Sequence, residues 1–191
     1  SAAFCLFGAE QPDGPARVDF PQFRDARGGL AEIYNADGLA ALGLDRFGQA
    51  NVSLTRDAGV VRGLHYQAPP SGQAKYLVVL AGAVESVAVD LREPGFGTVH
   101  RHRLGAFEPA LWLPQGFAHG VQSLAPQTVL LWFVSAPQDL ERSHCVAHDD
   151  AALAISWPLP VRAELLSPRD RAGEPLDRHR GLNWPLRLQS E

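Results

Sequence analysis

Short runs of alternating or continuous apolar residues recur through the middle of this chain, and glycine or proline separates them. In one run, Val87, Val89 and Leu91 alternate with polar or small residues, which is the two-residue period of a strand with one buried face. Stretches with helical period are few, so the pattern predicts an all-β sandwich or barrel. The predicted strands are Tyr76–Leu80, Val84–Leu91, Val99–Leu104, Ala110–Leu113 and Val129–Val134.

Three of these strands carry a further expectation. Gly82 separates Tyr76–Leu80 from Val84–Leu91, which predicts a hairpin between them. Val129–Val134 is apolar throughout, as expected of a strand that is covered on both faces. Together the strands predict a central β-barrel with a core from about residue 45 to residue 160.

The flanking segments predict peripheral structure. Asp37–Leu44 is the clearest candidate for a short helix, with Asp37 as its N-cap, and we expect it to cover a sheet edge. Five prolines after residue 157 predict an extended wrap over residues 160–191 rather than a second core. A chain of 191 residues suits one domain, so we expect a single domain over 1–191.

The charge and the cysteines exclude several classes of partner. Seventeen Lys and Arg against 21 Asp and Glu give a net charge of −4, so no global positive field attracts a nucleic acid. The longest apolar runs fall far short of the roughly 20 residues that span a bilayer. Cys5 and Cys145 form neither a disulfide framework nor a CxxC pair. We expect a cytoplasmic protein that binds neither nucleic acid nor membrane.

Two segments gather residue types suited to proton transfer and anion binding. The first runs over 61–67 and continues at 73–75, and it places Arg62, His65 and Lys75 around a loop rich in Gly and Pro. The second runs over 111–120 and carries a strand into a Gly-bounded turn that presents His119. The structural alternatives are a packed core histidine for His65 and a plain hairpin turn for the second segment.

A third segment, Leu166–Asp170, places Arg169 and Asp170 after a proline in the predicted wrap. Taken alone it reads as a solvated charge pair.

As a set, these segments resemble the signature blocks of the dTDP-4-dehydrorhamnose 3,5-epimerase family. The resemblance runs in order from about residue 18 to residue 176. The matching blocks are Phe23–Gly28, Glu32, Gln49–Ser53, Arg62–Gln67, Gln73–Lys75, Val87–Arg92, Pro114–Gly120, Ile155–Pro158 and Leu166–Asp170.

The resemblance implies a cupin-type β-barrel (jelly roll) with a few short peripheral helices, which works as a homodimer without metal or organic cofactor. It implies an epimerase whose substrate is a 4-keto-6-deoxy sugar linked to a nucleotide diphosphate. Such an enzyme inverts one or two of the carbons beside the ketone. His65 matches the family's base, Asp170 the carboxylate that orients it, and Lys75 the group beside the ketone oxygen. A cation there meets the negative charge of the enolate. A carboxylate beside a basic imidazole fixes its tautomer and stabilises the imidazolium that forms. The resemblance therefore predicts that Asp170 lies within hydrogen-bond reach of His65 at the mouth of the barrel, with Lys75 pointing into the same cavity.

Other positions match residues that hold the substrate. Arg62 and His119 match positions near the diphosphate and the sugar. The further candidates are Gln49, Asn51, Arg169 and Trp132 in the same subunit, and Phe23, Arg27 and Glu32, which match residues that the neighbouring subunit contributes.

The sequence departs from the family pattern at three positions. Trp132 stands where the family has its acid, a Tyr, and an indole N–H does not ionise usefully. Pro137 replaces an aromatic that packs on the nucleotide base, and Ser86 replaces an Asp. Water or the hydroxyl of Tyr66 can protonate the enolate instead, inversion can be confined to one carbon, or inversion can be lost.

Two other interpretations remain open. A metal-dependent cupin enzyme needs a His-x-His pair and a Glu, and His100, His102 and Glu108 have roughly that spacing. A degenerate cupin that binds a sugar nucleotide without turnover is favoured by Trp132 and Pro137, and opposed by the retained base and Lys.

Overall fold

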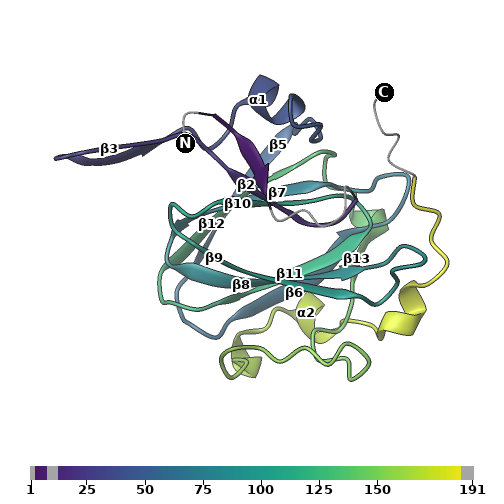
Figure 1. Cartoon of the computed structure of the whole chain (residues 1–191). Helices are drawn as coiled ribbons and strands as arrows, with labels where there is room; N and C mark the ends of the chain where they lie inside the picture. Colours follow the sequence, from purple (N-terminus) through teal and green to yellow (C-terminus); the bar gives the residue numbers. More distant parts are fainter. Residues whose placement is uncertain (1–2, 8–12, 186–191) are drawn as a thin grey trace.

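Two antiparallel β-sheets face each other and enclose the core of the protein (Figure 1), as seen in a computed structural model that describes residues 3–7 and 13–185. The first sheet has six strands in the order β1-β2-β10-β7-β12-β5. Its strands are β1 (Cys5–Phe7), β2 (Ala16–Asp19), β10 (Ala110–Leu113), β7 (Lys75–Ala81), β12 (Thr128–Val134) and β5 (Gln49–Thr55). The all-β class and the central barrel are therefore confirmed.

The second sheet has five strands in the order β13-β6-β11-β8-β9. Its strands are β13 (Ser143–Cys145), β6 (Val61–Gln67), β11 (Phe117–Ser123), β8 (Ala83–Asp90) and β9 (Val99–Gly105). Apolar residues of both sheets fill the space between them, with Leu77 and Leu111 from one and Val84 and Leu104 from the other. This alternation of inward and outward side chains explains the period seen in the sequence.

The outer face of each sheet is covered by a different part of the chain. Under the five-stranded sheet, Leu153 and Leu176 of the C-terminal segment pack on Leu64 and Val87 (Figure 1). This segment contains α2 (Pro168–Arg171) and the 3-10 turns Ala163–Leu165 and Leu176–His179, and no described residue beyond β13 forms a strand. The wrap thereby brings α2 against the back of β6.

Helix α1 (Ala36–Ala40) covers the outer face of the six-stranded sheet, where Leu39 packs against Val18 and Trp112. Its N-cap is Asn35 rather than the predicted Asp37, because the Asn35 side chain accepts the Gly38 N–H at 2.9 Å. The helix is also shorter than predicted. None of the helices in the described part of the chain is long and apolar enough to cross a membrane.

The predicted hairpin across Gly82 is wrong. β7 pairs with β10 and β12, whereas β8 pairs with β9 and β11 in the other sheet. Gly82 has a positive φ of 73°, and a Cβ there would overlap the Thr128 side chain, so this glycine turns the chain from one sheet to the other.

Two further expectations need correction. The sequence predicts that β12 is covered on both faces, but Leu131 and Phe133 are only partly buried. The barrel also begins before residue 45, since β1 and β2 pair into the six-stranded sheet. β3 (Gln22–Asp25) and β4 (Gly28–Ala31) form a separate two-stranded arm that projects from the barrel (Figure 1).

Candidate active site

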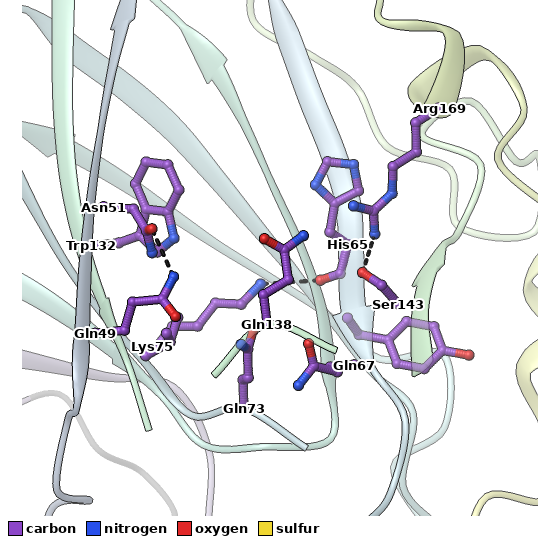
Figure 2. Close-up of a pocket in the computed structure, with 12 residues that line it drawn as sticks. Gln49, Asn51, His65, Gln67, Gln73, Lys75, Trp132, Gln138, Ser143 and Arg169 are labelled. Atoms are coloured by element: carbon purple, nitrogen blue, oxygen red, sulfur yellow. Dashed lines mark hydrogen bonds between the residues drawn. The ribbon is translucent and has the colours of Figure 1, made fainter. Parts of the chain in front are cut away.

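A cavity of about 160 Å³ opens between the edge strand β5 of one sheet and β6 of the other. Figure 2 shows that its lining is almost entirely polar. The lining residues are Gln49, Asn51, His65, Tyr66, Gln67, Gln73, Lys75, Trp132, Val134, Gln138, Ser143 and Arg169. A cavity of this kind suits a small polar ligand better than an apolar one.

His65 and Asp170 meet at this cavity although 105 residues separate them in sequence. The His65 Nε2 lies 2.6 Å from Asp170 Oδ1, and the side chains are 31% and 5% exposed. Asp170 is held from two further sides, because the Gly63 N–H donates to Oδ1 at 3.1 Å and the Ser167 hydroxyl donates to Oδ2 at 2.7 Å. The carboxylate thus fixes the imidazole with its proton on Nε2, which leaves Nδ1 as the nitrogen that can accept a proton.

The environment favours a neutral base beside a charged carboxylate. Burial lowers the pKa of His65 below its ordinary value, and the hydrogen bond that His65 donates to Asp170 only partly opposes this. Burial by itself raises the pKa of Asp170, but the hydrogen bonds from His65, Ser167 and Gly63 together hold it below the ordinary value. At neutral pH the pair is therefore imidazole and carboxylate, the state that a general base requires.

Lys75 lies across the cavity from this pair, on the first residue of β7. Figure 2 shows its side chain extending toward His65, where Nζ donates to the His65 carbonyl oxygen at 3.2 Å. Burial, and then the nearby positive charge of Arg169, lower the pKa of Lys75 to about 8. The ammonium still predominates at pH 7 and has little water around it, so it interacts strongly with any negative charge that develops in the cavity.

Gly63 allows β6 to approach β11 at the point where the site is built. Its φ is +119°, and a Cβ would lie 2.6 Å from the Gly120 Cα and the His119 carbonyl oxygen. The pairing of the two strands also shifts register between His119 and Val121. The glycine therefore sets how His65 faces its neighbours.

His119 lies within β11 and not on a turn, which corrects the sequence expectation. It pairs directly with His65 across the two strands, and its Nε2 is hydrogen-bonded to the Ser86 hydroxyl at 2.9 Å. Burial, followed by the charge of Lys75, holds the pKa of His119 well below the ordinary value. It is therefore a neutral group behind the cavity wall.

The opposite wall carries the candidates from β5 and β12. Gln49 Nε2 donates to Asn51 Oδ1 at 2.9 Å, and Asn51 pairs with Trp132 across the strands. Figure 2 shows the Trp132 indole beside these two amides. Arg169 reaches the cavity from α2 and donates to the Ser143 hydroxyl at 2.7 Å.

Besides His119, four predicted substrate contacts do not line the cavity. The exposed Arg62 is hydrogen-bonded to Thr55 at 3.3 Å, at the far end of β5 from Gln49. Phe23 and Arg27 are exposed on the projecting arm, and Glu32 follows it. The single chain does not bring these residues together with His65.

The hydroxyl of Tyr66 is not available as a proton donor. It lies 2.7 Å from His179 Nδ1, in the buried cluster behind β6, and burial raises the pKa of Tyr66 to about 12. Tyr66 contributes to the cavity lining, but side chains alternate along a strand, so its hydroxyl lies toward His179 and away from the face that carries His65. This removes one of the two alternative proton donors that the sequence left open.

The sequence does not single out Gln138 and Ser143 as site residues, although both line the cavity. Gln67 and Gln73 occur in the blocks that match the family but have no predicted role there. Gln67 has a bridging position, because its Nε2 donates to the Pro137 carbonyl oxygen at 3.0 Å and its Oε1 accepts the Asp139 N–H at 2.9 Å. It joins the loop after β12 to the cavity. Four glutamines line the cavity: Gln49, Gln67, Gln73 and Gln138. Their number is the only feature of the sequence that could have indicated a polar cavity, and glutamine is too common on protein surfaces for this to identify a site.

The proposed metal ligands of the alternative cupin interpretation do not form a site. Glu108 is exposed and its carboxylate accepts the Gly105 N–H at 2.9 Å. In the described residues, His100, His102 and Glu108 do not form a group of clustered ligand atoms.

Comparison with known proteins gives one consistent result. Residues 13–178 match the family model described as dTDP-4-dehydrorhamnose 3,5-epimerase. A dTDP-4-dehydrorhamnose 3,5-epimerase from Sinorhizobium fredii (strain NBRC 101917 / NGR234) is 36% identical over 156 residues, which cover 78% of each chain. A dTDP-4-dehydrorhamnose 3-epimerase from Streptomyces niveus is 39% identical over 164 residues, which cover 83% of this chain and 78% of the relative.

Solved structures agree with these relatives. The crystal structure of a dTDP-6-deoxy-D-glucose-3,5-epimerase from Legionella pneumophila Philadelphia 1, in complex with dTDP-4-keto-L-rhamnose, matches with a TM-score of 0.83 and 33% identity. The match covers 91% of this chain and 93% of that one. The cupin-type barrel expected from the sequence is confirmed by this likeness.

Proposed function

Because the chain belongs to the dTDP-4-dehydrorhamnose 3,5-epimerase family, we propose that it inverts one or two carbons beside the ketone of a nucleotide-linked 4-keto-6-deoxy sugar. The observation that carries the proposal is the 2.6 Å contact between His65 and Asp170 at a polar cavity that also holds Lys75. Relatives that act on either one centre or two are among the matches, so the number of inverted carbons is part of the test.

The proposed first step is removal of a proton from the carbon beside the ketone. The His65 Nδ1 accepts this proton, and the electron pair of the broken C–H bond passes into the carbonyl to form an enolate. Asp170 stabilises the resulting imidazolium through the bond to Nε2. A base with a pKa somewhat below neutrality is ready for this step at pH 7.

The proposed role of Lys75 is to meet the negative charge of the enolate oxygen. The ammonium is fixed by the His65 carbonyl before the substrate arrives, so little reorganisation is needed. The charge on the oxygen grows during the reaction, and the interaction is therefore stronger in the transition state than with the bound ketone.

Inversion also requires a proton from the other face of the sugar. Trp132 lies across the cavity from His65, and its indole donates hydrogen bonds without releasing a proton. With the Tyr66 hydroxyl buried behind β6, we assign this second proton to water held among the amides of Gln49 and Asn51.

The proposed assembly is a homodimer in which the arm of one subunit completes the site of the other. Phe23 and Leu30 are 57% and 69% exposed on the arm, and a hollow lined by residues 23–25 and 27–30 lies on its surface. Exposed apolar side chains on a projecting hairpin are typical of a contact surface. In this arrangement Arg27 and Glu32 reach a nucleotide that is bound in the neighbouring barrel.

The deuterium exchange of a keto sugar tests the function. The protein is incubated in deuterated water with dTDP-4-keto-6-deoxyglucose, and incorporation is resolved by carbon position. Deuterium at the carbons beside the ketone supports the epimerase, and its position gives the number of reacting centres. Tight binding without any incorporation would favour a sugar-nucleotide-binding protein without turnover, the alternative that Trp132 supports.

A further inference from the structure

Three side chains of metal-binding types converge next to the proposed base. One ring nitrogen of His65, the Cys145 Sγ and a carboxylate oxygen of Asp170 all lie within 4.8 Å of one another. They come from β6, β13 and α2, and Cys145 is the cross-strand partner of His65. The proposed epimerase mechanism uses His65 and Asp170 but gives Cys145 no task.

The arrangement is close to what a tetrahedral cation needs. Zn²⁺ binds sulfur at about 2.3 Å and nitrogen or oxygen at about 2.0–2.2 Å, so neighbouring ligand atoms lie roughly 3.3–3.7 Å apart. The contact between His65 and Asp170 has to widen from 2.6 Å, and the longest separation has to shorten by about 1 Å. The partly exposed imidazole has room to move, whereas Ser167 and Gly63 hold the carboxylate in place.

The charges also fit a divalent cation. A thiolate from Cys145 and the carboxylate of Asp170 supply two negative charges, and the imidazole of His65 is neutral. These two charges balance those of one Zn²⁺ ion in a site where Cys145 and Asp170 are both buried, and the positive charges of Arg169 and Lys75 act on the same site. With three protein ligands, the fourth position can take a water molecule, as in open zinc sites.

We propose that His65, Cys145 and Asp170 bind a thiophilic divalent cation such as Zn²⁺, and that its binding blocks the base of the active site. The binding itself does not depend on the proposed function. Only the inhibition rests on the epimerase mechanism, so the two parts can fail separately.

The chemistry of binding is balanced by the release of one proton. The Cys145 thiol loses its proton to solvent as the sulfur–metal bond forms, and the bond from His65 Nε2 to Asp170 is replaced by bonds to the metal. The proton formerly on Nε2 moves to Nδ1. Both ring nitrogens are then occupied, so the imidazole has no lone pair with which to take a proton from the sugar.

Burial raises the pKa of Cys145 to about 11, so the free thiol keeps its proton at neutral pH. A bound metal ion makes a coordinating thiol ionise despite this.

Cobalt absorption tests the site directly, because a Co²⁺–thiolate bond absorbs in the near ultraviolet. The purified full chain is titrated with Co²⁺ alone, alongside C145S and the matched control C5S, which removes the exposed cysteine on β1. We expect one Co²⁺ per chain with the thiolate band in the wild type and in C5S. In C145S the thiolate band should vanish, and the affinity for Co²⁺ should fall by roughly tenfold or more. Loss of a residue that merely supports a metal ligand already costs about tenfold, so loss of a ligand should cost at least as much.

A second variant keeps the outcome clear if C145S is poorly folded. H65N leaves both cysteines in place and should weaken Co²⁺ binding by roughly tenfold or more, while the far-ultraviolet circular dichroism stays that of the wild type. Absence of the thiolate band in the folded wild type overturns the proposal. A band that survives in C145S and disappears in C5S also overturns it, because the metal would then sit on the exposed thiol.

The inhibition is measured separately, by deuterium exchange with and without micromolar Zn²⁺. Exchange should fall at least tenfold in the wild type and in C5S, and the ratio of rates with and without Zn²⁺ should stay near one in C145S. If Co²⁺ binds but Zn²⁺ leaves exchange unchanged, the inhibitory part is wrong and the site stands. If the wild type shows no exchange at all, the proposed function has failed, and the cobalt titration still decides the site.

Discussion

The Lys75 ammonium and the His65 backbone are joined by a hydrogen bond of 3.2 Å, so the cation and the base occupy fixed positions relative to each other. The bond uses the carbonyl of His65 and leaves its ring free to contact Asp170. A substrate ketone that accepts a further hydrogen bond from the Lys75 ammonium therefore comes to lie next to the imidazole. This geometry underlies the first prediction.

Replacement of Lys75 by Met should lower the rate of deuterium exchange by about 10²–10³, because one charged donor to the enolate oxygen is lost. The near-isosteric side chain fills the same buried space, so the fold should remain. Nucleotide-sugar binding, measured by calorimetry, serves as the control and should change much less than exchange. Equal losses in binding and in exchange would show that Lys75 helps to bind the substrate but does not stabilise the transition state any further.

The pH dependence of exchange should have two limbs. The base must be neutral, so activity falls as the pH drops through the pKa of His65, which lies below its ordinary value of 6.5. The Lys75 ammonium must be charged, so activity falls as the pH rises through about 8. K75R keeps a charge at all accessible pH values, and in that variant the alkaline limb should disappear. An alkaline limb that stays near pH 8 in K75R would assign it to another group.

Replacement of Asp170 by Asn should reduce exchange by about 10²–10⁴, because an amide can hold the imidazole in the wrong tautomer and does not stabilise the imidazolium. S167A is the comparison variant: it removes the 2.7 Å bond to the other carboxylate oxygen and the N-cap bond from the Asp170 N–H at 3.1 Å, and it leaves Oδ1 with His65. We expect a much smaller loss there. The deuterium exchange rates of both variants, measured at several pH values, check this prediction. Equal losses of exchange rate in the two variants would mean that the position of Asp170 matters and its charge does not.

The chemistry of the site could be predicted from sequence more readily than its placement. Glycine at position 82 correctly indicated a turn, but a turn signal does not say whether the next strand pairs with the last one or crosses to a second sheet. The choice depends on which faces become buried, and burial is set by strands far away in the chain. Gly116 and Gly120 likewise indicate a turn around His119, but the pairing with distant strands places this residue inside β11.

The assignments that came from the family resemblance depend on contacts that no local pattern contains. Asp170 reaches His65 only because the C-terminal wrap packs on the back of β6. Arg62 has the residue type of an anion-binding group, yet it faces Thr55 instead of the cavity. The role of Phe23 on the projecting arm involves a second subunit, and a single chain does not define that contact.

The close approach of β6 and β11 predicts a large effect of a single methyl group. Gly63→Ala should destabilise the fold by on the order of 2–4 kcal/mol, because the residue has a positive φ and its Cβ would press on the backbone of β11. Gly43→Ala is the control, since Gly43 also has a positive φ but nothing lies within 4 Å of its added Cβ. That variant should lose only about 1 kcal/mol. Thermal unfolding of both measures the difference, and similar losses would exclude the contact as the cause.

Trp132 allows proton abstraction to be separated from inversion. Because the indole is not a proton source, Trp132→Phe should change deuterium exchange by less than about threefold, whereas Trp132→Tyr introduces a hydroxyl that can deliver a proton across the sugar from His65. In the Tyr variant the yield of inverted sugar per exchange event should rise, and in the Phe variant it should stay at the wild-type level. Both quantities come from one experiment, in which mass spectrometry counts exchange and chromatography separates the epimers. A large loss of exchange in the Phe variant would show that the indole itself supports the base step. An unchanged yield in the Tyr variant would show that water already reaches the second face efficiently in the native site.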